Sequence, residues 1–416
     1  MGASCSTLPS SGQCGCSLRS GWCLRFAIVR RSDPLPESLD RHHVERLGAI
    51  AGGYGITHTG VAAATVLVRA RSELHRRRDA GLHDTMQFTY KNPDRSTDPC
   101  AAVPGALAVF VGARPYSVGG VQRQPEGLGD LVTGRVARYA QADHYAPLRA
   151  GLWAVAEQLR ADGWKAVAFA DDNSIVDREV AHQAGLGWFG KNANLLITGA
   201  GSWFVLGCVV TTAPLPIAAA VAADGCGSCR RCLDGCPTGA IVAPGVVDAS
   251  RCLAWLLQKP GSFDRRFRRA VGDRLYGCDD CQEVCPPTVR LNVRSVSEPM
   301  PAPLDSAPIH SAPVDPVVDV LHLLQATDDE VLRRWGRWYL ADRDPRWLRR
   351  NALVILGNSG RSTDPRVVAA LVHALADVDP ILRAHAVWAA RMLGLSSLLP
   401  AGDPDPDVMT ELGAPL

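Results

Sequence analysis

The stretch Cys226-Gly-Ser-Cys229-Arg-Arg-Cys232-Leu-Asp-Gly-Cys236-Pro237 is the most informative part of this 416-residue chain. Two residues separate each of its first three cysteines, three residues precede the fourth, and a proline follows. This is the spacing of bacterial ferredoxins that carry two four-iron clusters. There, three thiolates hold one cube and the fourth reaches across to a second. The stretch therefore predicts two clusters rather than one.

A second set of cysteines lies downstream, and its last member is again followed by a proline. By the same crossover rule, this last cysteine returns to the first cube. The predicted ligands of cluster one are Cys226, Cys229, Cys232 and Cys285, and those of cluster two are Cys236, Cys252, Cys278 and Cys281. Zinc is the alternative, but a zinc site closes with four ligands and does not explain eight crossing ones.

Eight of the fourteen cysteines of the chain are concentrated in this one region. A secreted disulfide protein is short and cysteine-dense throughout, so the concentration indicates metal ligation in a reducing, cytoplasmic compartment. The net charge of +2 excludes a global attraction to nucleic acid, which leaves only local patches. The uncharged run at residues 203–223 contains two prolines, and we therefore predict no membrane-spanning helix.

The pattern along the chain divides it into modules. We expect an α/β domain, a ferredoxin-like module with two [4Fe-4S] clusters, and a C-terminal all-α domain of HEAT-like repeats. The Gly- and Ser-rich start is expected to be disordered or untranslated, because the first methionine after Met1 is Met86. The expected segments are 1–33 (extension), 34–218 (α/β domain), 219–292 (cluster module), 293–316 (proline-rich linker), 317–396 (helical repeats) and 397–416 (tail).

Apolar periodicity predicts the elements of the α/β domain. Helical patterns cover residues 37–83 and 143–159. Short apolar runs predict strands at 106–113, 166–170, 195–198 and 203–210.

The tail shows a weak internal repeat. Asp344-Pro345 and Asp379-Pro380 stand 35 residues apart, and each precedes an arginine and an apolar run. Asp364-Pro365 opens a further predicted helix between them. This period suits stacked helix pairs of the HEAT type.

Several strings resemble the epoxyqueuosine reductase family, over roughly residues 37–395 and in that family's domain order. They are Arg138-Tyr139-Ala140, Asp143-His144-Tyr145, Phe169-Ala170-Asp171-Asp172, Asp177-Arg178-Glu179, AGLGWFGK at 184–191, YGCDDCQEVCP at 276–286, RRNAL at 349–353 and Gly357-Asn358. The strings at 184–191 and 276–286 are the ones specific to this family. Residues 1–33 have no counterpart in the family.

The resemblance implies a cobalamin-type corrinoid over the α/β domain, supplied with electrons by the two clusters. The implied reaction removes the epoxide oxygen of epoxyqueuosine in tRNA, which gives queuosine. The resemblance also implies that Asp171 is the proton donor. An opening epoxide develops an alkoxide, which needs a positioned acid. Burial in a dry cleft would keep such a carboxyl protonated. Asp172 is its rival, expected on the opposite side of the strand, and His144 and Tyr145 are the next candidates.

Further corrinoid contacts are implied by the resemblance. Arg178, Gly187 and Lys191 are expected to flank the cleft, and Asp279 and Asp280 to bind the cofactor. The chain has no Asp-x-His-x-x-Gly motif, so we expect a corrinoid without a protein histidine ligand.

The tRNA contact is expected in the tail. Residues 331–350 carry seven arginines against Asp342 and Asp344, with Trp335, Trp338 and Trp347 interleaved. Arginines grip phosphates and exposed aromatic rings stack on bases, and Arg349 and Arg350 are our predicted tRNA residues.

Two other functions stay open from the sequence. One is a corrinoid iron–sulfur reductive dehalogenase, and the other is a non-catalytic ferredoxin-type electron carrier. For the reductase we expect a monomer that takes electrons from a low-potential donor of the flavodoxin or ferredoxin type.

Overall fold

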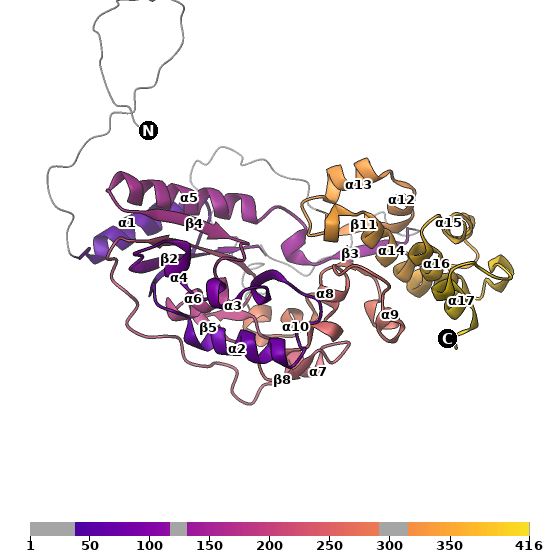
Figure 1. The fold of residues 1–416 in the computed structure, drawn as a ribbon, viewed down its shortest axis with the longest axis horizontal. Coiled ribbons are helices and arrows are strands. Elements are labelled where there is room, and N and C mark those ends of the chain that lie inside the picture. The colour runs from indigo at the N-terminus through magenta and orange to yellow at the C-terminus, as the bar shows by residue number, and fades with distance from the viewer. Residues whose placement is uncertain (1–37, 117–130, 291–314, 416) are drawn as a thin grey trace, which may run out of the picture. The chain divides into compact units, whose positions relative to one another are not determined.

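The computed structural model describes residues 38–116, 131–290 and 315–415 (Figure 1). The expected extension 1–33 and nearly all of the expected linker 293–316 lie outside these residues. All of these described residues belong to one compact unit.

A four-stranded sheet forms the centre of the first domain. Its order is β1 (His58–Ala63), β2 (Ala108–Pro115), β7 (Phe204–Thr211) and β4 (Ala166–Ala170). Every neighbouring pair runs antiparallel, so the helices do not connect parallel strands. The predicted alternation of strands and helices is present, and β4 has the predicted bounds.

Helices cover both faces of this sheet (Figure 1). α1 (Arg41–Gly52) and α5 (Tyr145–Ala161) pack on the face that carries Phe110. α2 (Val68–Asp79) and α6 (Asp177–Gln183) pack on the face that carries Val109 and Val111. Because neighbouring side chains of a strand alternate between faces, a strand covered on both sides is apolar along its covered part, as β2 is from Ala108 to Ala113. Shorter helices lie beside α2, namely α3 (Pro93–Ser96) and α4 (Pro99–Ala102).

The prediction of a helical pattern over 37–83 is wrong at β1. This strand separates α1 from α2, and its sequence, HTGVAA, is made largely of small residues. A side chain at Gly60 would place its Cβ 2.5 Å from the carbonyl oxygen of Ala184. The small residues therefore serve a close contact between β1 and the end of α6.

A second, three-stranded sheet joins parts of the chain that the sequence pattern assigned to separate modules. β3 (Thr133–Val136) lies between β10 (Arg274–Tyr276), which runs parallel to it, and β11 (Val317–Asp319), which runs antiparallel. The prediction of an all-helical segment from 317 onward is therefore wrong at β11. Strands this short give no period that a sequence pattern can detect.

The cysteine module has little regular structure. It contains α7 (Arg231–Asp234), the hairpin β8 (Ile241–Ala243) and β9 (Val246–Val247), α8 (Leu253–Leu256), α9 (Arg265–Val271) and α10 (Asp280–Glu283). A second hairpin, β5 (Gly187–Phe189) with β6 (Leu195–Ile197), leads from α6 toward it.

The tail consists of packed helices after β11. They are α12 (Val320–Gln325), α13 (Asp328–Trp335), α14 (Arg346–Ser359), α15 (Pro365–Leu375), α16 (Pro380–Met392) and α17 (Pro406–Gly413). Asp364, Asp379 and Asp405 each cap a helix whose first residue is proline. The Asp-Pro repeat is therefore a helix-start signal, since the carboxylate accepts from a free backbone N–H and proline needs none. The C-terminal segment 397–416, expected as a separate tail, contains α17.

A buried arginine joins α14 to the cysteine module. Arg350 is 0% exposed, and its guanidinium donates to the carbonyl oxygens of Leu256, Lys259 and Gly261. The neighbouring Asn351 amide donates to two further carbonyl oxygens of the module. Burial lowers the pKa of Arg350 to about 9, so the group is still a cation near neutral pH.

Replacement of Arg350 by Met is expected to destabilise the protein by roughly 3 kcal/mol or more, because it leaves several buried carbonyl groups without donors. The measurement is denaturant unfolding followed by tryptophan fluorescence. Arg333→Met removes an exposed guanidinium from α13 and is the matched control, expected to change stability by less than about 0.5 kcal/mol. Equal stability of the two variants would contradict the role assigned to Arg350.

Candidate active site

The four thiols predicted for cluster one line a common cavity. Cys226, Cys229, Cys232 and Cys285 surround a space of about 130 Å³ together with Lys191, Asn192, Leu196 and Pro286. Cys285 is distant from the other three cysteines in the sequence, and the fold brings it to the same cavity. The donor set and the space fit a four-iron cube, which takes one thiolate at each iron.

The cysteines predicted for cluster two are half-buried. Burial, followed by the neighbouring Cys252 and then Asp279 and Cys236, raises the pKa of the Cys281 thiol. Burial also raises the pKa of Cys252, with Cys236 again among its neighbours. Cys278 donates from its Sγ to Asp280 Oδ2 over 3.1 Å. The fold therefore brings Cys236, Cys252 and Cys281 close together, and cluster iron there would favour the thiolate form. The place of Cys278 in this set stays a prediction.

Within residues 38–116, 131–290 and 315–415, no three His, Cys, Asp or Glu side chains converge as the ligands of a single ion would.

The loop after β4 carries the predicted acid. Asp171 has φ +55°, in the left-handed region that is uncommon for a residue other than glycine. Ser96 fixes the loop, because its Oγ donates to the Asn173 carbonyl over 2.6 Å and its own carbonyl accepts from Val176 N–H. Since the strand ends at Ala170, the expected alternation of Asp171 and Asp172 along it does not apply.

The environment of Asp171 favours its protonated form. Its side chain reaches solvent, yet desolvation by the surrounding protein is the largest cause that raises its pKa. The Arg149 guanidinium opposes this increase, and the charges of Asp172 and Asp143 add to it. A raised pKa is the property that a general acid needs near neutral pH.

A second carboxyl lies close to Asp171. Asp177 begins α6, and its Oδ1 is buried with no hydrogen-bond partner among the described residues. Burial, followed by the charge of Asp171, raises the pKa of Asp177 well above its usual range. An unpaired buried carboxylate is costly, so burial favours the neutral acid form of this group. The sequence analysis quoted Asp177 only as part of a string and assigned it no role.

Tyr145 and His144 stand at the start of α5 near this loop. Burial, and then the charges of Asp171 and Asp177, raise the pKa of the Tyr145 hydroxyl. Burial, and then Arg114, lower the pKa of His144 to about 4, so its imidazole is neutral near pH 7. The fold thus gathers the acid candidates at one end of β4.

Arg178 links the acid loop to the cysteine module. Its guanidinium is exposed and donates to the Ala193 carbonyl over 3.2 Å. It is near enough to lower the pKa of both Asp177 and Cys252. The region of cluster two therefore adjoins the loop that carries Asp171.

Two of the predicted corrinoid contacts lie elsewhere. Lys191 donates from its Nζ to the Gly227 carbonyl over 2.6 Å and lines the cluster-one cavity. Gly187 is buried in the β5–β6 hairpin, where an added Cβ would lie 2.1 Å from the Leu196 carbonyl oxygen. The prediction for Gly187 is corrected, because this glycine serves strand contact and presents no open surface to a ligand.

Asp279 and Asp280 are already engaged by the protein. Asp279 is 5% exposed and accepts from the Arg138 N–H over 2.7 Å, which ties residues 138–140 to the module. Asp280 pairs with Arg274 over 2.7 Å. Their expected role in cofactor binding stays a prediction, and the geometry assigns them to the support of the module.

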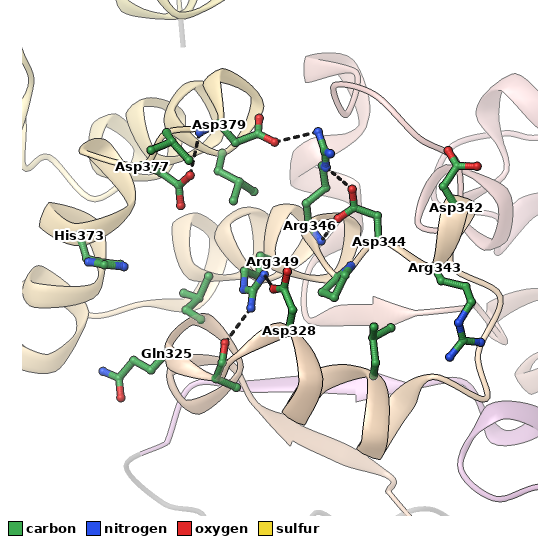
Figure 2. Close-up of a pocket in the computed structure, with 16 residues that line it drawn as sticks. Gln325, Asp328, Asp342, Arg343, Asp344, Arg346, Arg349, His373, Asp377 and Asp379 are labelled. Atoms are coloured by element: carbon green, nitrogen blue, oxygen red, sulfur yellow. Dashed lines mark hydrogen bonds and ion pairs between the residues drawn. The ribbon is translucent and has the colours of Figure 1, made fainter.

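Several arginines of the window 331–350, Arg349 among them, are paired with acidic side chains. A cavity of about 580 Å³ lies in the helical tail. Among the residues that line it, Arg349 pairs with Asp328, and Arg346 pairs with Asp344 and Asp379 (Figure 2). Arg334 and Arg337 share Asp315.

The tRNA prediction is wrong for Arg350, because its buried guanidinium offers no surface to a phosphate. It stays a prediction for Arg349, whose side chain is 16% exposed. The interleaved tryptophans are also buried, at 1% for Trp335 and 6% for Trp338 and Trp347, so they do not present faces for base stacking.

Residues 225–288 match the family model described as a 4Fe-4S double cluster binding domain. The chain is 34% identical over 378 residues to epoxyqueuosine reductase of Xanthomonas campestris, covering 89% of this chain and 99% of that protein. The chain belongs to the epoxyqueuosine reductase family. It is 34% identical to the Pseudomonas aeruginosa member over 78% of this chain and 87% of that protein.

Solved structures of epoxyqueuosine reductases have the same fold. One of them, with an epoxyqueuosine-modified tRNA-Tyr stem loop, matches with a TM-score of 0.76 and 25% identity over 88% of this chain and 96% of its own. The structure from Streptococcus thermophilus matches equally. Membership makes this protein an oxidoreductase with an iron–sulfur module, which excludes the non-catalytic carrier and disfavours the dehalogenase. No helix within the described ranges is long and apolar enough to cross a membrane.

Proposed function

We propose that this epoxyqueuosine reductase family member reduces epoxyqueuosine in the anticodon loop of tRNA to queuosine. The reaction breaks both C–O bonds of the epoxide and forms a C=C bond. It consumes two electrons and two protons and releases the oxygen as water. Family membership supports the substrate, since relatives carry this name and one solved relative holds the modified stem loop.

The observation that carries the mechanism is the position of Arg178. This guanidinium stands near Cys252 of cluster two and near Asp177 beside the acid loop. Electrons that arrive at cluster two are thus delivered close to the place where a proton is available. The order of transfer that we propose runs from cluster one, whose thiols line a surface cavity, through cluster two to the acid loop.

A corrinoid is the further cofactor in this proposal. Its amide side arms need hydrogen-bond partners, and the exposed Asp172, Asn173 and Arg178 beside Asp171 supply such groups. When bound, a corrinoid supplies the low-potential chemistry that cleaves a carbon–oxygen bond. No histidine of an Asp-x-His-x-x-Gly motif is present to ligate its metal.

The chain's own residues hold and deliver the proton. We propose that the Asp171 carboxyl donates from its oxygen to the departing epoxide oxygen. The left-handed backbone at Asp171 turns its side chain out of the strand. A solved Bacillus subtilis relative is described with its catalytic aspartate loop swung out of the active site. A loop of this kind in this chain would be the one that Ser96 pins.

The test is conversion of epoxyqueuosine-bearing tRNA by the anaerobically purified protein, with added cobalamin and a chemical reductant. We expect queuosine tRNA to form only when both are supplied. Conversion without any corrinoid would overturn the cofactor part of the proposal, and absence of conversion with clusters and corrinoid in place would overturn the substrate. A low-potential carrier of the flavodoxin or ferredoxin type is the proposed physiological donor.

A further inference from the structure

Trp188 has a buried indole N–H with no assigned partner. The residue is the centre of β5 and is 9% exposed. Its Nε1 has no hydrogen-bond partner among the described residues. Buried donors are nearly always bonded in native proteins, so an orphan of this kind points to a partner that belongs to the functional state.

The six-membered ring of this indole, along the edge next to the nitrogen, faces the start of the cysteine run. A Cβ added at Gly225 would lie 2.7 Å from Cζ2, 3.0 Å from Cη2 and 3.1 Å from Cε2 of Trp188. Cε2 is bonded directly to Nε1. Gly225 itself lines the cluster-one cavity and precedes Cys226. Only glycine allows the chain to pass this close to the ring.

The same indole packs with two ligands of cluster one. Trp188, Leu196 and Cys285 form one buried apolar cluster, and Cys226 packs against it. Two cysteines from the two ends of the module therefore meet at this side chain. Among the described residues no group accepts from this N–H, and the thiols of Cys226 and Cys285 in the same cluster make sulfur the acceptor chemistry at hand.

We propose that the Trp188 Nε1–H donates a hydrogen bond to a sulfur of cluster one, either a cluster sulfide or the Cys226 thiolate. Hydrogen bonds to cluster sulfurs are one of the factors that set the reduction potential of such clusters. The donor stabilises the reduced form more, because that form carries one additional negative charge. Trp188 is thus a positioning residue that raises the potential of the cluster we propose as the point of electron entry.

The test is an anaerobic redox titration of the purified protein without substrate, followed by electron paramagnetic resonance. Trp188→Phe keeps an aromatic ring but removes the N–H. We expect the equilibrium constant for one-electron reduction of cluster one to fall about tenfold, which is a decrease of about 59 mV for a one-electron couple. The couple of cluster two is expected to stay unchanged. Cluster one is identified as the couple that survives in Cys252→Ala.

A second substitution separates hydrogen bonding from packing. Benzothienylalanine in place of Trp188 has the shape of the indole with sulfur instead of N–H, and it is expected to reproduce the decrease. Trp335→Phe is the matched control, since Trp335 is also buried with an unpartnered Nε1 but lies in the helical tail. Trp335→Phe is expected to leave the reduction potentials of both clusters unchanged.

Three results would overturn the inference. They are an unchanged cluster-one couple in the benzothienylalanine protein, a shift confined to the cluster-two couple, and an equal shift in Trp335→Phe. Because no substrate or corrinoid is present, these results are independent of the proposed reaction. If Trp188→Phe loses iron, the isosteric protein alone decides the outcome.

Discussion

Asp171→Asn is expected to slow the conversion of epoxyqueuosine tRNA by a factor of about 10² to 10⁴, the usual effect of losing a general acid. Asparagine keeps the shape of the side chain but has no acidic proton to give. Cluster content and corrinoid binding should be unchanged, because electron delivery precedes the protonation. The measurement is single-turnover conversion, with the absorbance of the reduced corrinoid followed in the same sample.

Asp172→Asn is the matched control for this experiment. Asp172 is the next residue, is also exposed, and uses its Oδ1 to accept from the Ser174 N–H over 2.7 Å. Its loss should cost far less. If Asp172→Asn is inactive while Asp171→Asn is active, then Asp172 is the acid and Asp171 is not. If both variants are active, the acid lies elsewhere, and Tyr145 and His144 are the next side chains to replace.

The rate of conversion is also expected to depend on pH through the Asp171 carboxyl. The acid form of Asp171 is the working form, and desolvation raises its pKa above the ordinary value. The rate is therefore expected to be full below this raised pKa and to fall as the pH rises through it. The sign for stability is the same, since a carboxyl whose pKa is raised by folding destabilises the folded state as it ionises. Asp171→Asn should abolish this alkaline fall and should not lower stability at neutral pH. An unchanged fall in rate would assign it to another group.

Cys252→Ala is expected to remove cluster two and with it all turnover. Iron should decrease from about eight to about four atoms per chain, because each cube holds four irons. Turnover is lost completely if electrons reach the loop that carries Asp171 only through cluster two. Iron and sulfide analysis with tRNA conversion measures both quantities.

Cys100→Ala is the control for cysteine loss. The Cys100 thiol donates to the carbonyl oxygens of Ala64 and Ala106, far from the cysteine run in the sequence. Its replacement should leave iron content and turnover unchanged. Full iron content in Cys252→Ala would show that the fourth ligand of cluster two is another residue.

The sequence by itself determined the features that depend on short-range spacing. The crossing cysteine pattern placed Cys226 and Cys285 on one cluster, and the fold brings their thiols to one cavity. The apolar run 166–170 predicted β4 with its correct bounds, and so placed Asp171 at the end of a strand. Asp-Pro pairs marked helix starts because capping is a local interaction.

Only the tertiary structure decided which charged residues are available. The arginine-rich window 331–350 contains two aspartates, but folding adds Asp315, Asp328 and Asp379 from outside it. It also buries Arg350 against carbonyl groups of the cysteine module. Likewise, the sequence showed Trp188 as a letter in a family string, while its unpartnered N–H beside Cys226 exists only in the folded chain. Local patterns record which side chains are present. Charge, burial and hydrogen bonding are set by neighbours that are distant in sequence, and these are determined only when the chain packs.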